Sequence, residues 1–99
     1  MKIKQEDLEK CCLFFKSLSD PTRFKIIETL RDGEKCVNEI CSALNMSPSA
    51  VSHQLTMLKK VKVVKSRRAG KNIYYAFDDE HVTGVIDLAL AHSAHSTFL

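Results

Sequence analysis

Apolar residues recur at spacings of three and four along much of the chain, a period typical of amphipathic helices. One stripe runs from Leu8 to Leu18 and includes Cys11 and Cys12, and a shorter stripe lies within residues 37–44. Both stretches are predicted to be helices that turn these residues toward a core.

Two further helices carry recognisable start signals. Asp20 with Pro21, and Ser47 with Pro48, each place a side-chain acceptor at the N-cap and a proline at the first helical position. The first of these helices is expected to end at about residue 32, just before a glycine that can take the left-handed conformation. The second has three apolar residues on one face: Val51, Leu55 and Leu58.

Only two residues separate the third predicted helix from the fourth, and two short helices joined by so tight a turn match the helix-turn-helix pattern. The second helix of that motif lies in the major groove of DNA. Its face opposite the apolar stripe has small or hydrogen-bonding side chains and no carboxylate, as a groove-facing surface requires. These residues are Ser49, Ser52, His53, Thr56 and Lys60.

Two β-rich runs follow, residues 63–68 and 72–77, on either side of a glycine-containing turn, which predicts a β-hairpin. Its tip is expected to carry Arg67, Arg68 and Lys71 to an adjacent DNA backbone or minor groove. The predicted fold is therefore mainly α with a β-hairpin. It is a single-domain winged helix-turn-helix spanning residues 1–99, with the element order α-α-α-α-β-β-α.

The distribution of charge supports a DNA partner. The 99 residues include 15 Lys and Arg against 12 Asp and Glu, a net charge of +3. From Ile40 to Phe77 there are seven basic residues and no acidic residue, so positive charge is concentrated in the helix-turn-helix and the hairpin. Considered alone, this charge also fits a solvated face that keeps the protein soluble.

Chain length and hydropathy limit where the protein can be located and whether it is stable as a monomer. No apolar run approaches the roughly 18 residues of a bilayer span, and the first ten residues lack an apolar signal segment. We therefore expect a cytoplasmic protein with no membrane partner, in which the four cysteines are thiols, metal ligands or core residues. A monomer of this size is marginally stable, so a homodimer is expected.

A last helix is predicted from about 79 to 95, and it is more apolar than its own small domain can cover. Part of its surface is therefore expected to pack against a second subunit, so that the homodimer forms through the terminal helices. The helix also has four side chains suited to binding zinc, cobalt or nickel. These residues are Asp79, His81, His92 and His95.

These four side chains are too far apart along one helix to bind a single ion. His81 and His92 share a face but are separated by about 16 Å along the axis. An antiparallel copy of the helix would set Asp79 and His81 of one subunit beside His92 and His95 of the other, giving two identical intersubunit sites. Four protein ligands leave no position for water, which argues against a hydrolytic zinc enzyme, and we expect no enzymatic activity. The alternative is that these histidines are ordinary exposed residues.

The run LNMSPSAVSHQLTMLKKVKVVKSRRAGKNIYYAFDDEHV, with DPTRFKIIETL before it and HSAH after it, resembles the ArsR/SmtB family of metal-responsive winged-helix repressors. The resemblance spans about residues 12–95 and is strongest to the zinc and cobalt sensors of the family. It implies a homodimer that binds operator DNA without metal and releases it when metal binds between the C-terminal helices, derepressing efflux or sequestration genes. It also implies that Ser49, Ser52 and His53 face the groove. Pro48 replaces a polar residue of close relatives, so a base contact is lost there.

The cysteines leave alternatives open. Soft-metal sensors of the same family use a C-V-C pair on the third helix with N-terminal thiols, and the run Cys36-Val37-Asn38 keeps only the first cysteine of that pair. Cys11, Cys12 and Cys36 are therefore a candidate cadmium or lead site, or a redox switch. Otherwise Cys12 and Cys41 fill the core and the other two are ordinary thiols. A metal buffer without a DNA role is a further alternative, and it predicts no salt-sensitive DNA binding.

Overall fold

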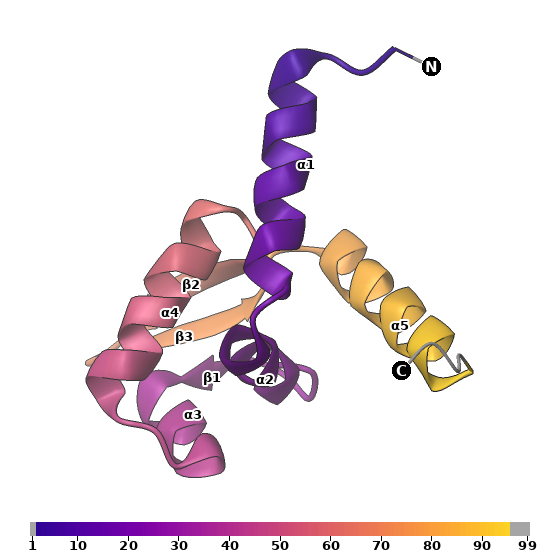
Figure 1. Cartoon of the computed structure of the whole chain (residues 1–99). Coiled ribbons are helices and arrows are strands. Elements are labelled where there is room, and N and C mark those ends of the chain that lie inside the picture. The colour runs from indigo at the N-terminus through magenta and orange to yellow at the C-terminus, as the bar shows by residue number, and fades with distance from the viewer. Residues whose placement is uncertain (1, 96–99) are drawn as a thin grey trace.

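The computed structural model describes residues 2–95, which form five helices and a three-stranded antiparallel sheet (Figure 1). The strand order is β1-β3-β2. The predicted winged helix-turn-helix is confirmed, with one strand more than expected. The helices are α1 (Gln5–Leu18), α2 (Pro21–Thr29), α3 (Val37–Leu44), α4 (Pro48–Lys60) and α5 (Glu80–Ala94). The strands are β1 (Lys35–Cys36), β2 (Val64–Ala69) and β3 (Asn72–Phe77).

The additional strand, β1, joins the hairpin to the loop after α2. Lys35 pairs with Tyr75 and Cys36 pairs with Tyr74 of β3. A strand of two residues is too short to show an alternating pattern, so the sequence predicts no strand at this position. Its effect is to tie the segment before α3 to the inner strand of the hairpin.

Both capped helices begin where the sequence predicts. The side chain of Asp20 accepts a hydrogen bond from the amide of Arg23 at 2.9 Å, and Ser47 Oγ accepts one from the amide of Ala50 at 3.2 Å. Helix α2 ends at Thr29, earlier than expected. The amides of residues 30, 31 and 33 each bond to a carbonyl three residues back, which tightens the end into a turn.

The end of α4 has the hydrogen bonds of a Schellman motif. The amide of Lys62 bonds to the carbonyl of Lys59 at 3.2 Å, and the amide of Val63 bonds to the carbonyl of Leu58 at 3.0 Å. Lys62 is in the left-handed region with φ 61°, where glycine is usual. The turn thus directs the chain from α4 into β2 while Leu58 and Val63 are both buried.

The core joins α2, α3 and α4 to one face of the sheet and to the first half of α5. The predicted apolar face of α4 is confirmed, because Val51, Leu55 and Leu58 are fully buried. The remaining buried residues are Ile26, Ile27, Leu30, Ile40, Val63, Val64, Val82 and Ile86. The polar face of α4 is therefore turned away from the body.

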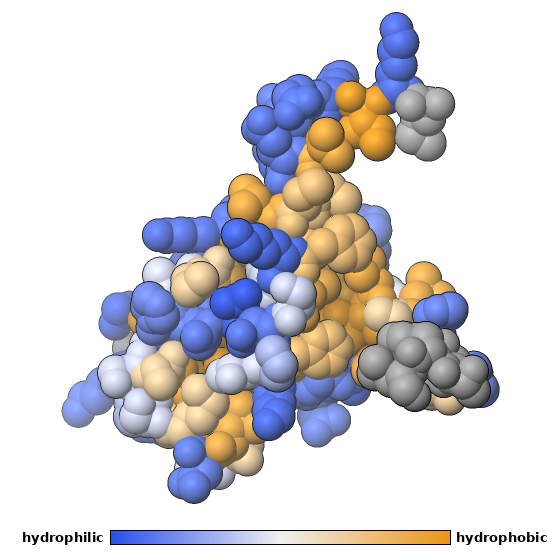
Figure 2. Space-filling model, viewed as in Figure 1, coloured by the Kyte–Doolittle hydropathy of each residue, from blue (hydrophilic) through white to orange (hydrophobic). Residues whose placement is uncertain are grey.

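Helices α1 and α5 extend beyond this body (Figure 1). The radius of gyration is 14.6 Å, above the roughly 13 Å of a compact domain of this length. No residue of α1 is buried, and the prediction that Cys12 fills the core is wrong, because Cys12 is exposed within the single chain. Leu88 of α5 is 74% exposed, and Figure 2 shows apolar surface along α1 and between α1 and α5.

No helix within residues 2–95 is both long enough and apolar enough to cross a bilayer.

Substitution of one core residue tests the importance of this packing. Ile26 is fully buried, so Ile26→Ala should lower the free energy of unfolding by about 2–5 kcal/mol through lost burial and the cavity left behind. Lys25→Ala, an exposed position on the same helix, should change it by less than about 0.5 kcal/mol. Urea unfolding at one fixed protein concentration measures both values, and equal effects would contradict this description of the core.

Candidate nucleic-acid interface and metal ligands

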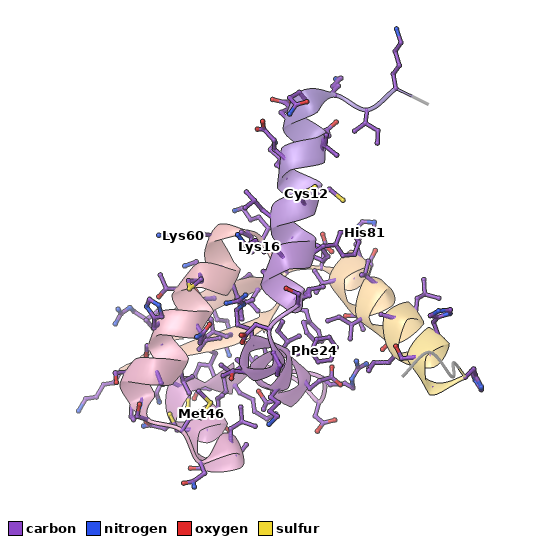
Figure 3. The ribbon with its side chains drawn as sticks, in the orientation of Figure 1. Cys12, Lys16, Phe24, Met46, Lys60 and His81 are labelled. Carbon is purple, nitrogen blue, oxygen red and sulfur yellow. The ribbon has the colours of Figure 1, made fainter. Side chains whose placement is uncertain are left out.

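Helix α4 presents the polar face that the sequence predicts. Ser49, His53, Thr56 and Lys60 are exposed, and Ser52 is half-buried. Figure 3 shows Lys60 pointing outward from the end of α4. No acidic side chain belongs to α4, so its exposed face offers hydroxyl, imidazole and ammonium groups without a carboxylate to repel phosphates.

The turn between α3 and α4 fixes the supporting helix against the exposed one. Asn45 takes the left-handed conformation with φ 54°, and the amide of Met46 bonds to the carbonyl of Cys41 at 3.2 Å. Ile40 of α3 lies in the same buried cluster as Val51 of α4. The two helices therefore form a rigid helix-turn-helix unit, with the face of α4 opposite this contact left open.

The hairpin of β2 and β3 forms the predicted wing. Ala69 pairs with Asn72 across a two-residue turn, and Gly70 has φ 63°, as the first central position of a type II′ turn requires. Lys71 lies in the turn itself, Arg68 is the next-to-last residue of β2, and both are exposed. These two cations are therefore placed as the sequence predicts.

Arg67 lies one residue further from the turn than Arg68, opposite Tyr74 of β3, and its side chain is paired with Glu34. Its Nε donates to both carboxylate oxygens of Glu34, at 3.1 and 2.9 Å, and its Nη2 also contacts Glu34. The guanidinium lies 5.2 Å from the centre of the Tyr74 ring. The hydrogen bonds from Arg67 lower the pKa of Glu34, and the same bonds raise the pKa of Arg67.

The first two candidate metal ligands lie together at the start of α5. Asp79 is the N-cap, and its Oδ1 accepts a hydrogen bond from the amide of His81 at 2.9 Å. His81 Nδ1 lies 3.3 Å from the same oxygen. The hydrogen bond from the imidazole and the bond from the amide lower the pKa of Asp79. Both side chains are exposed, with His81 at 87%, so a ligand can reach them from solvent.

The other two candidate ligands lie at the opposite end of α5. His92 is in its last turn and His95 is its C-cap, and both are exposed. Within residues 2–95 of one chain, no group of three or more histidine, cysteine or acidic side chains is placed to hold an ion. One subunit therefore separates the four predicted ligands into two pairs, and the intersubunit site stays a prediction.

The cysteines are dispersed in the same way. Cys11 and Cys12 are exposed on α1, whereas Cys36 is half-buried at the start of α3 (Cys12 is labelled in Figure 3). The amide of Cys36 donates to Glu39 Oε1 at 2.9 Å, and this bond lowers the pKa of Glu39. A three-cysteine site is therefore not assembled within the described part of one chain.

A hollow of about 650 Å³ lies between α1, the start of α5 and the turn after α4. Its lining includes Cys11 and Phe14 of α1 together with Asp79 and His81. The sequence does not predict that a thiol of α1 faces the same hollow as two candidate ligands of α5. Only the folded arrangement brings these segments together, since they are about 70 residues apart.

One ion pair joins α5 to the helix-turn-helix body. Arg31 Nη1 lies 2.5 Å from Asp87 Oδ1, and Arg31 also contacts Glu28 at 2.9 Å. The hydrogen bonds that Arg31 donates to Glu28 and to Asp87 raise the pKa of Arg31. Neither this pair nor the pair of Glu34 with Arg67 is expected from the sequence, because no local spacing relates residues so far apart in the chain.

Comparison with known proteins agrees with this architecture. The model of the family described as "Bacterial regulatory protein, arsR family" matches residues 20–66, from the cap of α2 into β2. A "Transcriptional repressor SmtB homolog" of Synechocystis is 45% identical over 69 residues, which cover 70% of this chain and 52% of that protein. The chain thus spans about half the length of this curated relative.

Two solved structures share the whole fold. The solution structure of apo-NmtR has a TM-score of 0.82 and 32% identity, and the alignment covers 100% of this chain and 83% of that one. A homodimeric winged helix-turn-helix DNA-binding domain from Mycobacterium bovis has a TM-score of 0.88 and 25% identity. The alignment with that domain covers 98% of this chain and 92% of that one.

The pH dependence of stability tests the bond that starts α3. The pKa of Glu39 is lowered in the folded chain, so its carboxylate stabilises the fold above the ordinary carboxyl pKa of 4.5, and this contribution is lost as the pH falls through the folded value. Glu39→Ala should therefore destabilise the protein more at pH 7 than at pH 3. Urea unfolding at the two values measures the difference. Glu6→Ala, in the first turn of α1, is the control.

Proposed function

Since the chain belongs to the ArsR family of bacterial regulatory proteins, we propose that it is a homodimeric, metal-responsive repressor of transcription in the cytoplasm. Without metal it binds double-stranded operator DNA through α4 and the wing. Zinc, cobalt or nickel bound between the α5 helices lowers its affinity for DNA, which derepresses genes for metal efflux or sequestration. The observation that carries the proposal is the division of four ligands between the two ends of one exposed helix.

The dimer is supported by the apolar surface that one chain leaves open. Helix α5 buries Val82 and Ile86 in its first half, whereas Leu88 and Leu90 are exposed in its second half. Helix α1 adds exposed Leu13 and Phe15. Apolar surface of this extent is typical of an association site. A second copy covers it without any segment from another protein.

The metal site follows from an antiparallel pairing of α5. One end of the helix offers Asp79 and His81, and the other end offers His92 and His95, so two antiparallel copies give two equivalent four-ligand sites. One carboxylate oxygen and three imidazole nitrogens suit zinc or cobalt. Four protein ligands form a closed site, which suits a sensor and leaves no position for a reacting water. We therefore assign the chain no enzymatic activity.

Metal binding and DNA binding are linked through the geometry of the dimer. A dimer on a palindrome holds its two recognition helices about 34 Å apart, one turn of DNA. Ions that fix the pairing of α5 select one spacing of the α4 helices, and a spacing that does not match the operator weakens binding. Such coupling typically amounts to about 1–3 kcal/mol, and operator DNA must weaken metal binding by the same factor.

A thiol-based sensor is the second candidate, favoured by the place of Cys11. Cys11 and Cys12 are exposed, and Cys11 lines the hollow that also contains His81. In this alternative Cys11, Cys12 and Cys36 take cadmium or lead, or respond to oxidants. Replacing all three by serine separates the candidates. If zinc still lowers the DNA affinity of the triple variant, these thiols have no part in the mechanism. If zinc no longer lowers it, the thiols form the effector site.

Two histidine substitutions separate the DNA surface from the metal site. His53→Ala should weaken DNA binding about tenfold or more because His53 is exposed on the groove-facing side of α4, and it should leave zinc binding unchanged. His92→Ala should weaken zinc binding, and it should leave the DNA affinity of the metal-free protein unchanged. Fluorescence anisotropy measures DNA affinity, and calorimetry measures zinc affinity. If the parent protein and both variants show no salt-sensitive DNA binding, the metal-buffer alternative is favoured.

Zinc titrations with and without operator DNA test the linkage itself. Zinc should bind two ions per dimer, and saturating zinc should lower DNA affinity about 5- to 150-fold at pH 7.5. The effect should fade below about pH 6, because imidazoles must be neutral to bind the metal. Equal zinc affinities with and without DNA would contradict the proposed regulation.

A further inference from the structure

The pair of Glu34 and Arg67 lies on the face of the sheet that points away from the helices. Val64 of β2 is buried, and side chains alternate along a strand, so Lys65 and Arg67 are on the opposite, exposed face. Tyr74 is the cross-strand neighbour of Arg67, and Cys36 of β1 is the next neighbour of Tyr74. Glu34 precedes β1 by one residue and reaches Arg67 across this face.

The carboxylate of Glu34 occupies the edge of the Arg67 guanidinium that is formed by Nε and Nη2. Nε and Nη2 of Arg67 both donate to this carboxylate, and the Tyr74 ring lies 5.2 Å from the guanidinium carbon. A phosphate that binds arginine by two parallel bonds uses the same kind of edge. A DNA phosphate must therefore displace Glu34 to use this edge of Arg67.

The pair also changes the charge of the wing. Seven basic residues lie between Ile40 and Phe77 with no acid among them, but the fold brings Glu34 into this region from outside it. The side chains of Arg67 and Glu34 are 57% and 38% exposed, so water and salt reach both. Exposed ion pairs are weak, and a phosphate backbone competes with them effectively.

We propose that Glu34 competes with DNA phosphates for Arg67, and that this intramolecular pair holds the DNA affinity of the wing below the value its cations allow. The inference rests on the DNA-binding part of the proposed function and is independent of the metal. Glu34 acts through Arg67 and touches no DNA. Its substitution therefore changes both the affinity and the salt dependence of binding.

The test uses a mixed-sequence DNA duplex of about 30 base pairs, because non-specific binding depends mainly on phosphate contacts. The full chain is assayed in chelator by fluorescence anisotropy over a range of salt. Glu34→Gln should bind about three- to tenfold more tightly at about 50 mM salt, and its plot of log affinity against log salt should be steeper by about 0.9, the value for one added phosphate contact. Glu6→Gln on α1 removes the same charge away from the wing and should bind like the parent protein.

The double variant Glu34→Gln, Arg67→Gln identifies the source of the gain. It should return to within about twofold of the parent affinity, because it lacks both members of a pair whose charges already cancel. A double variant that keeps the gain shows that Glu34 repels DNA directly, which overturns the proposal. A double variant much weaker than the parent protein shows that Arg67 already binds DNA beside Glu34, which also overturns it.

Two further outcomes are decisive. Glu34→Gln that binds no more tightly than Glu6→Gln overturns the competition but leaves the proposed function standing, whereas a parent protein without salt-dependent DNA binding contradicts both. Urea unfolding checks that each variant is folded. If Glu34→Gln is unstable, Glu34→Asp provides the second measurement, because its shorter side chain weakens the contact and should give a smaller gain in the same direction.

Discussion

The burial of a single stripe of α4 is the constraint on which the candidate DNA surface depends. Val51, Leu55 and Leu58 are fully enclosed by residues of α2, α3 and the sheet, so the helix cannot rotate without exposing them to water. With that rotation fixed, the opposite face must point outward, whatever its residues are. The polar character of that face then decides what the surface can bind. Core packing therefore orients the interface without contributing a contact to it.

Local signals in the sequence account for most of the fold. Two N-caps followed by proline predict the starts of α2 and α4, and the helical period of Val51, Leu55 and Leu58 predicts which face of α4 is buried. The hairpin follows from two β-rich runs around Gly70. Each of these signals acts within about ten residues, where backbone preference and side-chain period are informative without knowledge of the rest of the chain.

Features that join distant segments are those that the sequence does not predict. Strand β1 exists because its two residues can pair with β3, and Arg67 is held on the sheet because Glu34 lies beside it in the fold. The exposure of Cys12 has a similar origin, since α1 has the stripe of a buried helix but only the end of that stripe, at Leu18, packs against the core of one chain. For the candidate metal site, the sequence places ligands at both ends of α5, and a pairing between chains is needed to join them.

The turn after α4 places two demands on one position. Lys62 occupies the left-handed conformation that costs an ordinary residue about 1–2 kcal/mol and costs glycine almost nothing. Glycine there would relax the backbone but would also remove an ammonium group from the corner between the recognition helix and the wing. Selection for stability thus favours glycine at this position, whereas selection for DNA affinity favours lysine. In this chain Lys62 keeps the positive charge, and the backbone of the turn is strained as a result.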